Sequence, residues 1–169
     1  MKRDGFTIIE LAVAGIIIAV LVAAYCTFAS IEEDRKRCGS VNLLLLRRAM
    51  DVYANGHDHH FPSPDKWCDL LLEYTDVDEK QFRCPAQKRG RCHYAMNPNA
   101  EPNSPGDVVL LFETKGGWNQ SGGPEILSTK NHWLSGCNVR FVDGHGEWVK
   151  AEDIGRLNWG TAGKEQSAK

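Results

Sequence analysis

Gly5-Phe6-Thr7-Ile8-Ile9-Glu10 stands directly before LAVAGIIIAVLVAAYCTFA (residues 11–29), a run of nineteen residues without a charge. As a helix, residues 6–29 would be about 36 Å long, which is enough to cross a hydrocarbon core of about 30 Å with some tilt. Glu10 is the one charged residue in this span. Because a carboxylate is costly in lipid, Glu10 is expected to have a partner or a function.

The N-terminal flank distinguishes this segment from a secretory signal peptide. A signal peptide is cleaved after its apolar region, whereas here a short basic leader, residues 1–5, ends in Gly5 before the apolar region begins. Gly5, Phe6 and Glu10 at this spacing resemble the prepilin-type cleavage and methylation segment of type IV pilins and type II secretion pseudopilins. The resemblance implies that a prepilin peptidase cuts after Gly5 and methylates the amine of Phe6. An ordinary signal anchor is the alternative.

Charge and composition argue against a nucleic-acid-binding or nucleotide-binding protein. The net charge is −2, and no basic-aromatic stripe, P-loop or dinucleotide-binding glycine pattern is present, so nucleic acid is not expected as a partner. Basic residues lie on both sides of the span, at 2–3 and at 35–37, and they do not decide its orientation. The pilin resemblance implies an inner-membrane protein whose C-terminal region lies outside the cytoplasm, in the periplasm or at the cell surface.

The patterning predicts an α+β chain with one long N-terminal helix against a small antiparallel sheet of three or four strands. Its expected parts are a leader (1–5), a transmembrane helix (6–29), an amphipathic extension of that helix (30–55), a head domain (56–160) and a disordered tail (161–169). Along the extension, two neighbouring apolar rows at spacings of three and four are expected to be buried: Cys38, Val41, Leu45, Ala49 and Val52 in one, and Leu43, Leu46, Met50 and Tyr53 in the other. Gly39-Ser40 is a predicted bend.

The head shows local signals for one helix and a hairpin. A short helix is expected after Ser63-Pro64, with its buried face formed by Trp67, Leu70, Leu71 and Tyr74. Strands are expected at 107–114, 137–142 and 145–149, with Asp143-Gly144 as the turn between the last two. Residues 116–124 are rich in glycine and predict an irregular loop. The histidines of 57–60 are interpreted as a solvated loop.

A second resemblance lies at this hairpin. His132 and the segment Asn138-Val139-Arg140-Phe141-Val142-Asp143-Gly144-His145 are similar to a prepilin-associated family named for an H-x9-D-G motif, as are the segments 82–85 and 94–97. The family-motif residues here are His132, Asp143 and Gly144. Ten residues separate His132 from Asp143, where the motif has nine. The resemblance implies a pilin-like exported protein and supplies no chemistry.

The six cysteines bear on the redox state and on metals. Cys26 lies in the span and Cys38 on the helix extension, whereas Cys68, Cys84, Cys92 and Cys137 belong to the head. In an exported head disulfides are allowed; Cys84 and Cys92 are the predicted pair because they are close in sequence, and Cys68 is left to join Cys137 or Cys38. The sequence contains no C-x-x-C motif, the spacing that would indicate a zinc site. Calcium is the one metal kept open, because some secretion pseudopilins hold it, although no Asp-rich loop is seen.

These observations favour a structural function over an enzymatic one. The first hypothesis is a pilin-like or pseudopilin-like subunit whose partners are a prepilin peptidase, the inner membrane and other pilin-like subunits, with Glu10 pairing with the Phe6 amine of a neighbour. The alternative is a membrane-anchored extracytoplasmic module that binds a ligand through 116–124 and does not polymerise. An anchored metallo-enzyme is the least favoured hypothesis; its candidate site residues are His132, Asp143, His145 and Glu113, with Ser128, Thr129 and Ser135 nearby.

Overall fold

The computed structural model describes residues 7–132 and 135–160, apart from the side chains of residues 32, 34–36 and 38. The predicted leader with Gly5, the new N-terminal residue Phe6 and the predicted tail 161–169 lie outside the described residues, as does the side chain of Cys38. The chain divides into two compact units, residues 1–34 and 35–169.

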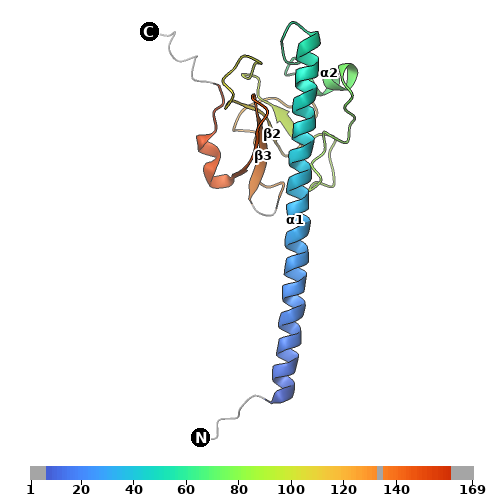
Figure 1. The fold of residues 1–169 in the computed structure, drawn as a ribbon, viewed down its shortest axis with the longest axis vertical. Helices are drawn as coiled ribbons and strands as arrows, with labels where there is room; N and C mark the ends of the chain where they lie inside the picture. The colour runs from blue at the N-terminus through green and yellow to red at the C-terminus, as the bar shows by residue number, and fades with distance from the viewer. Residues whose placement is uncertain (1–6, 133–134, 161–169) are drawn as a thin grey trace. The chain divides into compact units, whose positions relative to one another are not determined.

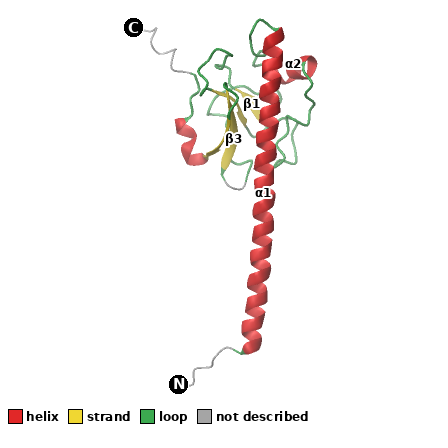
Figure 2. Cartoon of the chain, in the orientation of Figure 1, coloured by secondary structure: helices red, strands yellow, loops and turns green. Residues whose placement is uncertain are grey.

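One helix, α1 (Ile8–Gly56), belongs to both units (Figures 1 and 2). This confirms the prediction of a single helix through the apolar span and its amphipathic extension. The helix is continuous through Gly39-Ser40, so the predicted bend does not interrupt it. It ends at Gly56. In the following loop His59 and His60 are exposed, as expected for solvated histidines, whereas His57 is half-buried and stacks on Tyr53 of α1.

In the first unit, the α1 segment Ile8–Ile31 is long and apolar enough to cross a membrane. Every residue from 7 to 31 is exposed, and none of this segment is buried inside the structure. The described part of the first unit therefore has no core of its own. A continuous apolar surface of this size requires a cover of lipid or protein.

The second unit contains a four-stranded antiparallel sheet in the order β1-β2-β3-β4. The strands are yellow in Figure 2. Its strands are β1 (Tyr94–Met96), β2 (Val109–Glu113), β3 (Gly136–Phe141) and β4 (Gly146–Lys150). The last three confirm the strands expected from the sequence, whereas the short β1 was not anticipated. Asp143-Gly144 forms the predicted turn: the N–H of Gly144 donates to the carbonyl of Phe141, and Gly144 has a φ of 90°, a conformation that favours glycine.

The sheet lies between two apolar clusters, since neighbouring strand residues point to opposite faces. Leu111 belongs to the cluster formed with α1 and with α2 (Trp67–Tyr74), and Phe112 belongs to the cluster formed with the C-terminal residues Leu157 and Trp159. A 3-10 helix, η1 (Ala151–Arg156), leads from β4 to those residues. The head is thus a sheet covered on both faces.

The α1 extension buries one of its two predicted rows. Leu43, Leu46 and Met50 are fully buried together with Ala49, whereas Val41 and Val52 are 48% and 56% exposed. The prediction that both rows are buried was therefore wrong for Val41 and Val52 of the first row. The two rows are adjacent on the helix, and only the row that faces the sheet and α2 receives a partner.

The short helix α2 begins at Trp67, three residues after Pro64, and buries Trp67, Cys68 and Leu71. Tyr74, predicted to be buried, is half exposed and packs edge-on against Tyr53 of α1. The first turn of α2 is capped from a distant loop, because the N–H of Cys68 donates to Asn119 Oδ1 at 2.8 Å. This long-range cap was not readable from the local sequence.

Two arginines form hydrogen bonds that join α1 to β3 and the residue after it within the second unit. Arg47 donates to the carbonyls of Phe141 and Val142 and pairs with Asp51 on its own helix. From the opposite side, Arg140 of β3 donates to the carbonyl of Ser40 at 2.7 Å. These contacts fix the position of the α1 residues 40–47 against β3. They also place Gly39 beside the buried side chains of Glu113 and Asn138.

Candidate functional site

Glu10 lies in the first turn of α1 and takes part in a capping box with Thr7. The backbone N–H and the hydroxyl of Thr7 donate to Glu10 Oε2 at 2.8 and 2.9 Å, and Thr7 Oγ1 accepts the N–H of Glu10 at 3.3 Å. A Thr followed three residues later by Glu, before an apolar run, is the sequence signature of this motif. Glu10 thus has a local structural role in addition to the assembly role predicted for it.

The four candidate residues of the enzyme hypothesis lie at two separate places in the head. Asp143 and His145 pair with each other at the hairpin turn, where Asp143 Oδ1 and His145 Nδ1 are 2.5 Å apart and both side chains are half exposed. The hydrogen bond from the His145 N–H lowers the pKa of Asp143. His132 instead contacts Glu113, and both of their side chains are fully buried. The hypothesis of one site containing all four residues has no geometric support among the described residues.

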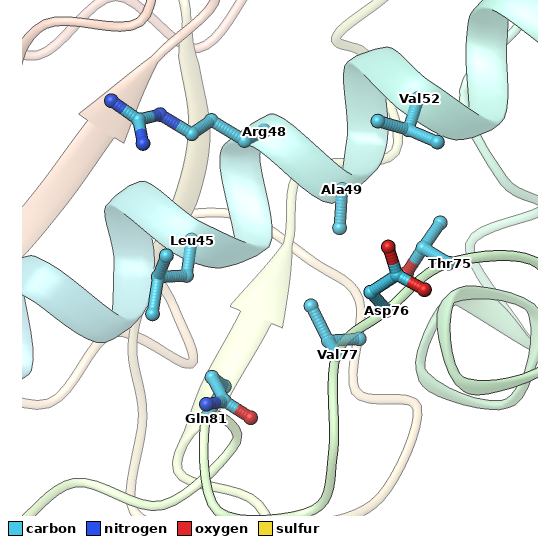
Figure 3. Close-up of a pocket in the computed structure, with 8 residues that line it drawn as sticks. All are labelled: Leu45, Arg48, Ala49, Val52, Thr75, Asp76, Val77 and Gln81. Atoms are coloured by element: carbon cyan, nitrogen blue, oxygen red, sulfur yellow. The ribbon is translucent and has the colours of Figure 1, made fainter.

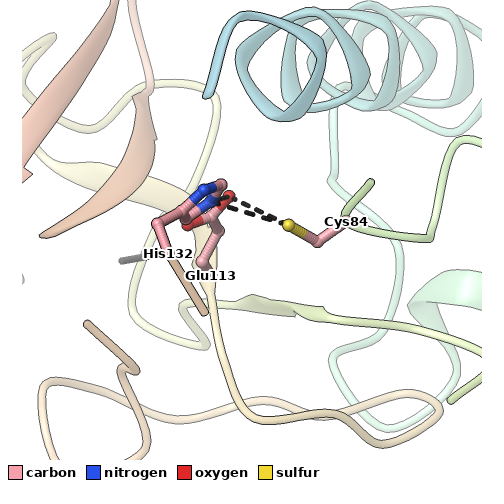
Figure 4. Close-up of side chains that lie close together, drawn as sticks. All are labelled: Cys84, Glu113 and His132. Carbon is pink, nitrogen blue, oxygen red and sulfur yellow. Dashed lines mark hydrogen bonds and ion pairs between the residues drawn. The ribbon is translucent and has the colours of Figure 1, made fainter. Parts of the chain in front are cut away.

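A compact cluster of three buried side chains replaces that grouping (Figure 4). Glu113 ends β2, His132 lies in the segment before β3, and Cys84 comes from the loop that precedes β1. His132 Nε2 lies 3.1 Å from Glu113 Oε1, Cys84 Sγ lies 3.7 Å from Glu113 Oε1, and Cys84 Sγ lies 3.6 Å from His132 Nε2. The sequence places these residues 29 and 19 positions apart, so no local spacing indicated them.

The surroundings of the cluster hold Glu113 and His132 in place. Asn138 donates its backbone N–H to Glu113 Oε2 at 3.1 Å and its side-chain amide to Glu113 Oε1 at 3.0 Å. Trp148 packs edge-on against the His132 ring, with centroids 5.0 Å apart. Glu113 is therefore a buried carboxylate with several donors around it, which is the usual condition for retaining such a group.

The cluster is unsuited to nucleophilic catalysis. A triad needs the nucleophile on one ring nitrogen of the base and the orienting acid on the other, whereas Cys84 and Glu113 both contact His132 Nε2. Burial and the nearby Glu113 charge raise the pKa of the Cys84 thiol to about 12. A buried thiol with a raised pKa is a poor nucleophile.

The predicted Cys84–Cys92 bridge is absent, because the two thiols point to different neighbours. Cys68, Cys84, Cys92 and Cys137 are buried free thiols. Cys92 donates to the carbonyl of Tyr94 at 3.3 Å and shares a hydrogen bond with the thiol of Cys68. Burial, and secondarily this hydrogen bond, raises the pKa of Cys68. The geometry thus favours Cys68, and not Cys84, as the partner of Cys92.

In an oxidising compartment we expect a Cys68–Cys92 disulfide. Closing the loop between these residues would stabilise the head by about 2–4 kcal/mol. Mass mapping of the full chain, unfolded in denaturant with a chelator and alkylated without reduction, should show the Cys68 and Cys92 peptides linked and the Cys84 and Cys137 peptides alkylated. A Cys84–Cys92 linkage, or four alkylated head cysteines after export, would contradict the pairing.

Gly39 allows α1 to approach the cluster closely. A Cβ at this position would lie 2.9 Å from Glu113 Oε1 and 2.9 Å from Asn138 Nδ2. Both groups are buried and hydrogen-bonded to each other, so they cannot move aside freely. The glycine predicted to bend the helix therefore acts through close packing.

Gly39→Ala is expected to destabilise the head by about 1–3 kcal/mol, as overpacking does. Gly56→Ala is the matched control, since it makes the same change in the same helix where nothing lies within 4 Å. Denaturant unfolding of the two full-length variants in detergent measures the difference. Equal midpoints would show that the contact at Gly39 relaxes without cost.

The loop 116–124, which the ligand-binding alternative would use, is largely engaged within the head. Trp67 Nε1 donates to the carbonyl of Gln120, Trp118 Nε1 donates to Asp69, and the N–H of Gly122 donates to the carbonyl of Met96. These bonds join the loop to α2 and β1. Its residues therefore have structural partners, and the described loop offers no group of side chains aimed at a ligand.

A shallow pocket of about 220 Å³ lies elsewhere on the head, between α1 and the segment after α2 (Figure 3). Its lining residues are Leu45, Arg48, Ala49, Val52, Thr75, Asp76, Val77 and Gln81. It contains one acid and one base but no cysteine or histidine, so its lining suggests no catalytic chemistry. Val52, which was predicted to be buried but is exposed, is part of this lining.

No family model matches the chain, and neither a curated protein nor a solved structure matches it. The comparisons therefore assign no family. Function is inferred from the N-terminal segment and the head of this chain alone.

Proposed function

We propose that this protein is a pilin-like structural subunit of a type II secretion or type IV pilus-like system. A prepilin peptidase cleaves it after Gly5, α1 anchors it in the inner membrane, and the head lies outside the cytoplasm. Neighbouring subunits then pack through the N-terminal part of α1. The protein acts by assembly and not by catalysis.

The carrying observation is the composition and exposure of the α1 segment Ile8–Ile31. It is apolar, it is unburied along its whole length, and its first turn contains the lone acid Glu10. Lipid can cover such a surface before assembly, and like helices from other subunits can cover it afterwards. Cleavage creates an amine at Phe6, and in the assembled state Glu10 can pair with the amine of a neighbouring subunit. A pair with the amine of its own chain is the alternative, and it would matter only for insertion.

The ligand-binding alternative has weaker support. A helix that merely anchors a domain does not need a carboxylate within its apolar segment, since the charge opposes insertion. The loop 116–124 that would contact a ligand is occupied by bonds to α2 and β1. We therefore favour assembly as the role of the protein.

Photo-crosslinking in the membranes of the producing cell tests this proposal. A photoreactive amino acid is placed at Val13 or Ile17, two exposed positions of the span, and the crosslinked products are identified by mass spectrometry. We expect crosslinks to this chain or to other proteins with the same kind of N-terminal segment. Crosslinks to lipid alone at both positions would favour a solitary anchor.

A further inference from the structure

We propose that Cys84, Glu113 and His132 bind a zinc ion and form a structural metal centre inside the head. This inference is independent of the proposed function, because it rests on the geometry of three side chains within the second unit. Each of them offers one ligand atom: Sγ of Cys84, Oε1 of Glu113 and Nε2 of His132.

The distances between the three ligand atoms are close to those of a tetrahedral zinc site. With zinc bonds of about 2.3 Å to sulfur and about 2.0–2.1 Å to nitrogen and oxygen, tetrahedral angles separate sulfur from nitrogen or oxygen by about 3.5–3.6 Å and nitrogen from oxygen by about 3.3–3.4 Å. The observed separations are 3.6 Å for Sγ–Nε2, 3.7 Å for Sγ–Oε1 and 3.1 Å for Nε2–Oε1. Shifts of a few tenths of an ångström would complete the site.

The three ligand atoms also converge, since one atom from each residue faces both of the others (Figure 4). The donor set identifies the metal class. Thiolate and imidazole ligands favour zinc over calcium and magnesium, which take oxygen ligands.

The groups around the cluster suit a second shell. Asn138 holds both oxygens of Glu113, Oε2 through its backbone N–H and Oε1 through its side-chain amide, and so fixes the carboxylate with Oε1 facing the other two ligand atoms. Trp148 fixes the plane of the His132 ring, and Gly39 permits α1 to cover the site. Outer partners that orient ligands in this way contribute strongly to metal affinity.

Water or the side-chain oxygen of Asn138 would occupy the fourth tetrahedral position of the zinc ion. The side-chain amide of Asn138 already lies 3.0 Å from Glu113 Oε1, and a half-turn of that amide would present its oxygen. On binding, the Cys84 thiol releases its proton to solvent. His132 binds through Nε2 as the neutral imidazole with its proton on Nδ1, and a proton held between Nε2 and Glu113 Oε1 in the metal-free protein also passes to solvent. No electron transfer is involved, because zinc has no redox chemistry at such a site.

Titration of the reduced, full-length protein in detergent with Zn²⁺ tests the site. After removal of metal by a chelator, competition with a chromophoric zinc ligand should give one zinc per chain. Cys84→Ser and His132→Asn should each weaken binding by about 100-fold or more, beyond the effect of losing an outer partner. Cys137→Ser, which removes another buried thiol of the head, should retain the wild-type affinity, and so should Cys68→Ser.

Cobalt provides a readout on the unmodified protein. Bound Co²⁺ should give a thiolate-to-cobalt absorption band in the wild type and in Cys137→Ser, and none in Cys84→Ser. Absence of stoichiometric zinc and of this band in the folded wild type would overturn the proposal, whatever the stability of the variants. Binding that survives Cys84→Ser, or that disappears with Cys68→Ser, would also overturn it. None of these outcomes bears on assembly in the membrane, which is measured separately.

Discussion

Glu10→Gln is expected to reduce crosslinking between subunits by about tenfold, while cleavage and membrane insertion remain at the wild-type level. Glutamine keeps the shape of the side chain and can accept the same hydrogen bonds from Thr7 as Glu10 does. What it removes is the charge that would pair with the amine of a neighbouring subunit. A factor of ten corresponds to about 1.4 kcal/mol, near the lower end of the coupling energies of close charge pairs between partners.

The capping box makes the choice of variant important. Glu10→Ala removes both the charge and the cap, so a loss of assembly in that variant has two explanations. Thr7→Val is the complementary control, because it removes the hydroxyl that bonds to Glu10 and leaves the charge. We expect Thr7→Val to assemble almost as well as the wild type. If Glu10→Gln crosslinks normally, or if Thr7→Val is equally defective, the charge is not what joins the subunits.

Glu113→Ala is expected to lower the free energy of unfolding of the head by about 3–5 kcal/mol. Glu113 accepts hydrogen bonds from the backbone and side chain of Asn138 and contacts His132, and all three residues are buried. Removing the carboxylate leaves these groups enclosed without their acceptor and creates a cavity. Both effects act in the same direction.

Denaturant unfolding of the full-length protein in detergent measures this loss, with a chelator present so that bound metal makes no contribution. Glu152→Ala is the control, because that carboxylate is exposed and its removal should change stability by less than about 0.5 kcal/mol. Glu113→Gln should lie between the two, since its amide retains one oxygen acceptor. A Glu113→Ala protein as stable as Glu152→Ala would show that the cluster does not hold the head together.

The sequence predicted those parts of the fold that depend on local pattern. The long helix follows from an uninterrupted apolar and then amphipathic run, and the β3–β4 hairpin follows from Asp143-Gly144 between two alternating segments. Which α1 row is buried could not be predicted in the same way. Two adjacent rows have similar apolar character, and only the position of the sheet and α2 decides that Leu46 is buried and Val52 exposed.

The candidate sites also differ in whether they depend on local sequence or on tertiary packing. The Thr7–Glu10 capping box is a local signal that the sequence contains in full. The pairing of Cys92 with Cys68, and the meeting of Cys84 with Glu113 and His132, depend on how β1, β2 and their loops pack. Nearness in sequence favoured Cys84–Cys92, whereas tertiary packing gives the two thiols different partners, Glu113 and His132 for Cys84 and the Tyr94 carbonyl for Cys92.

The mass of the N-terminal peptide of the membrane-assembled protein tests the pilin-like function most directly. A pilin-like subunit should give a peptide that begins at Phe6 with a methylated amine, and Gly5→Glu should abolish that cleavage because the peptidase must admit a small, flexible residue before the scissile bond. The Gly5→Glu protein should still insert, since its apolar span is unchanged. A wild-type peptide that retains Met1 in the assembled, membrane-bound form would contradict the pilin-like function.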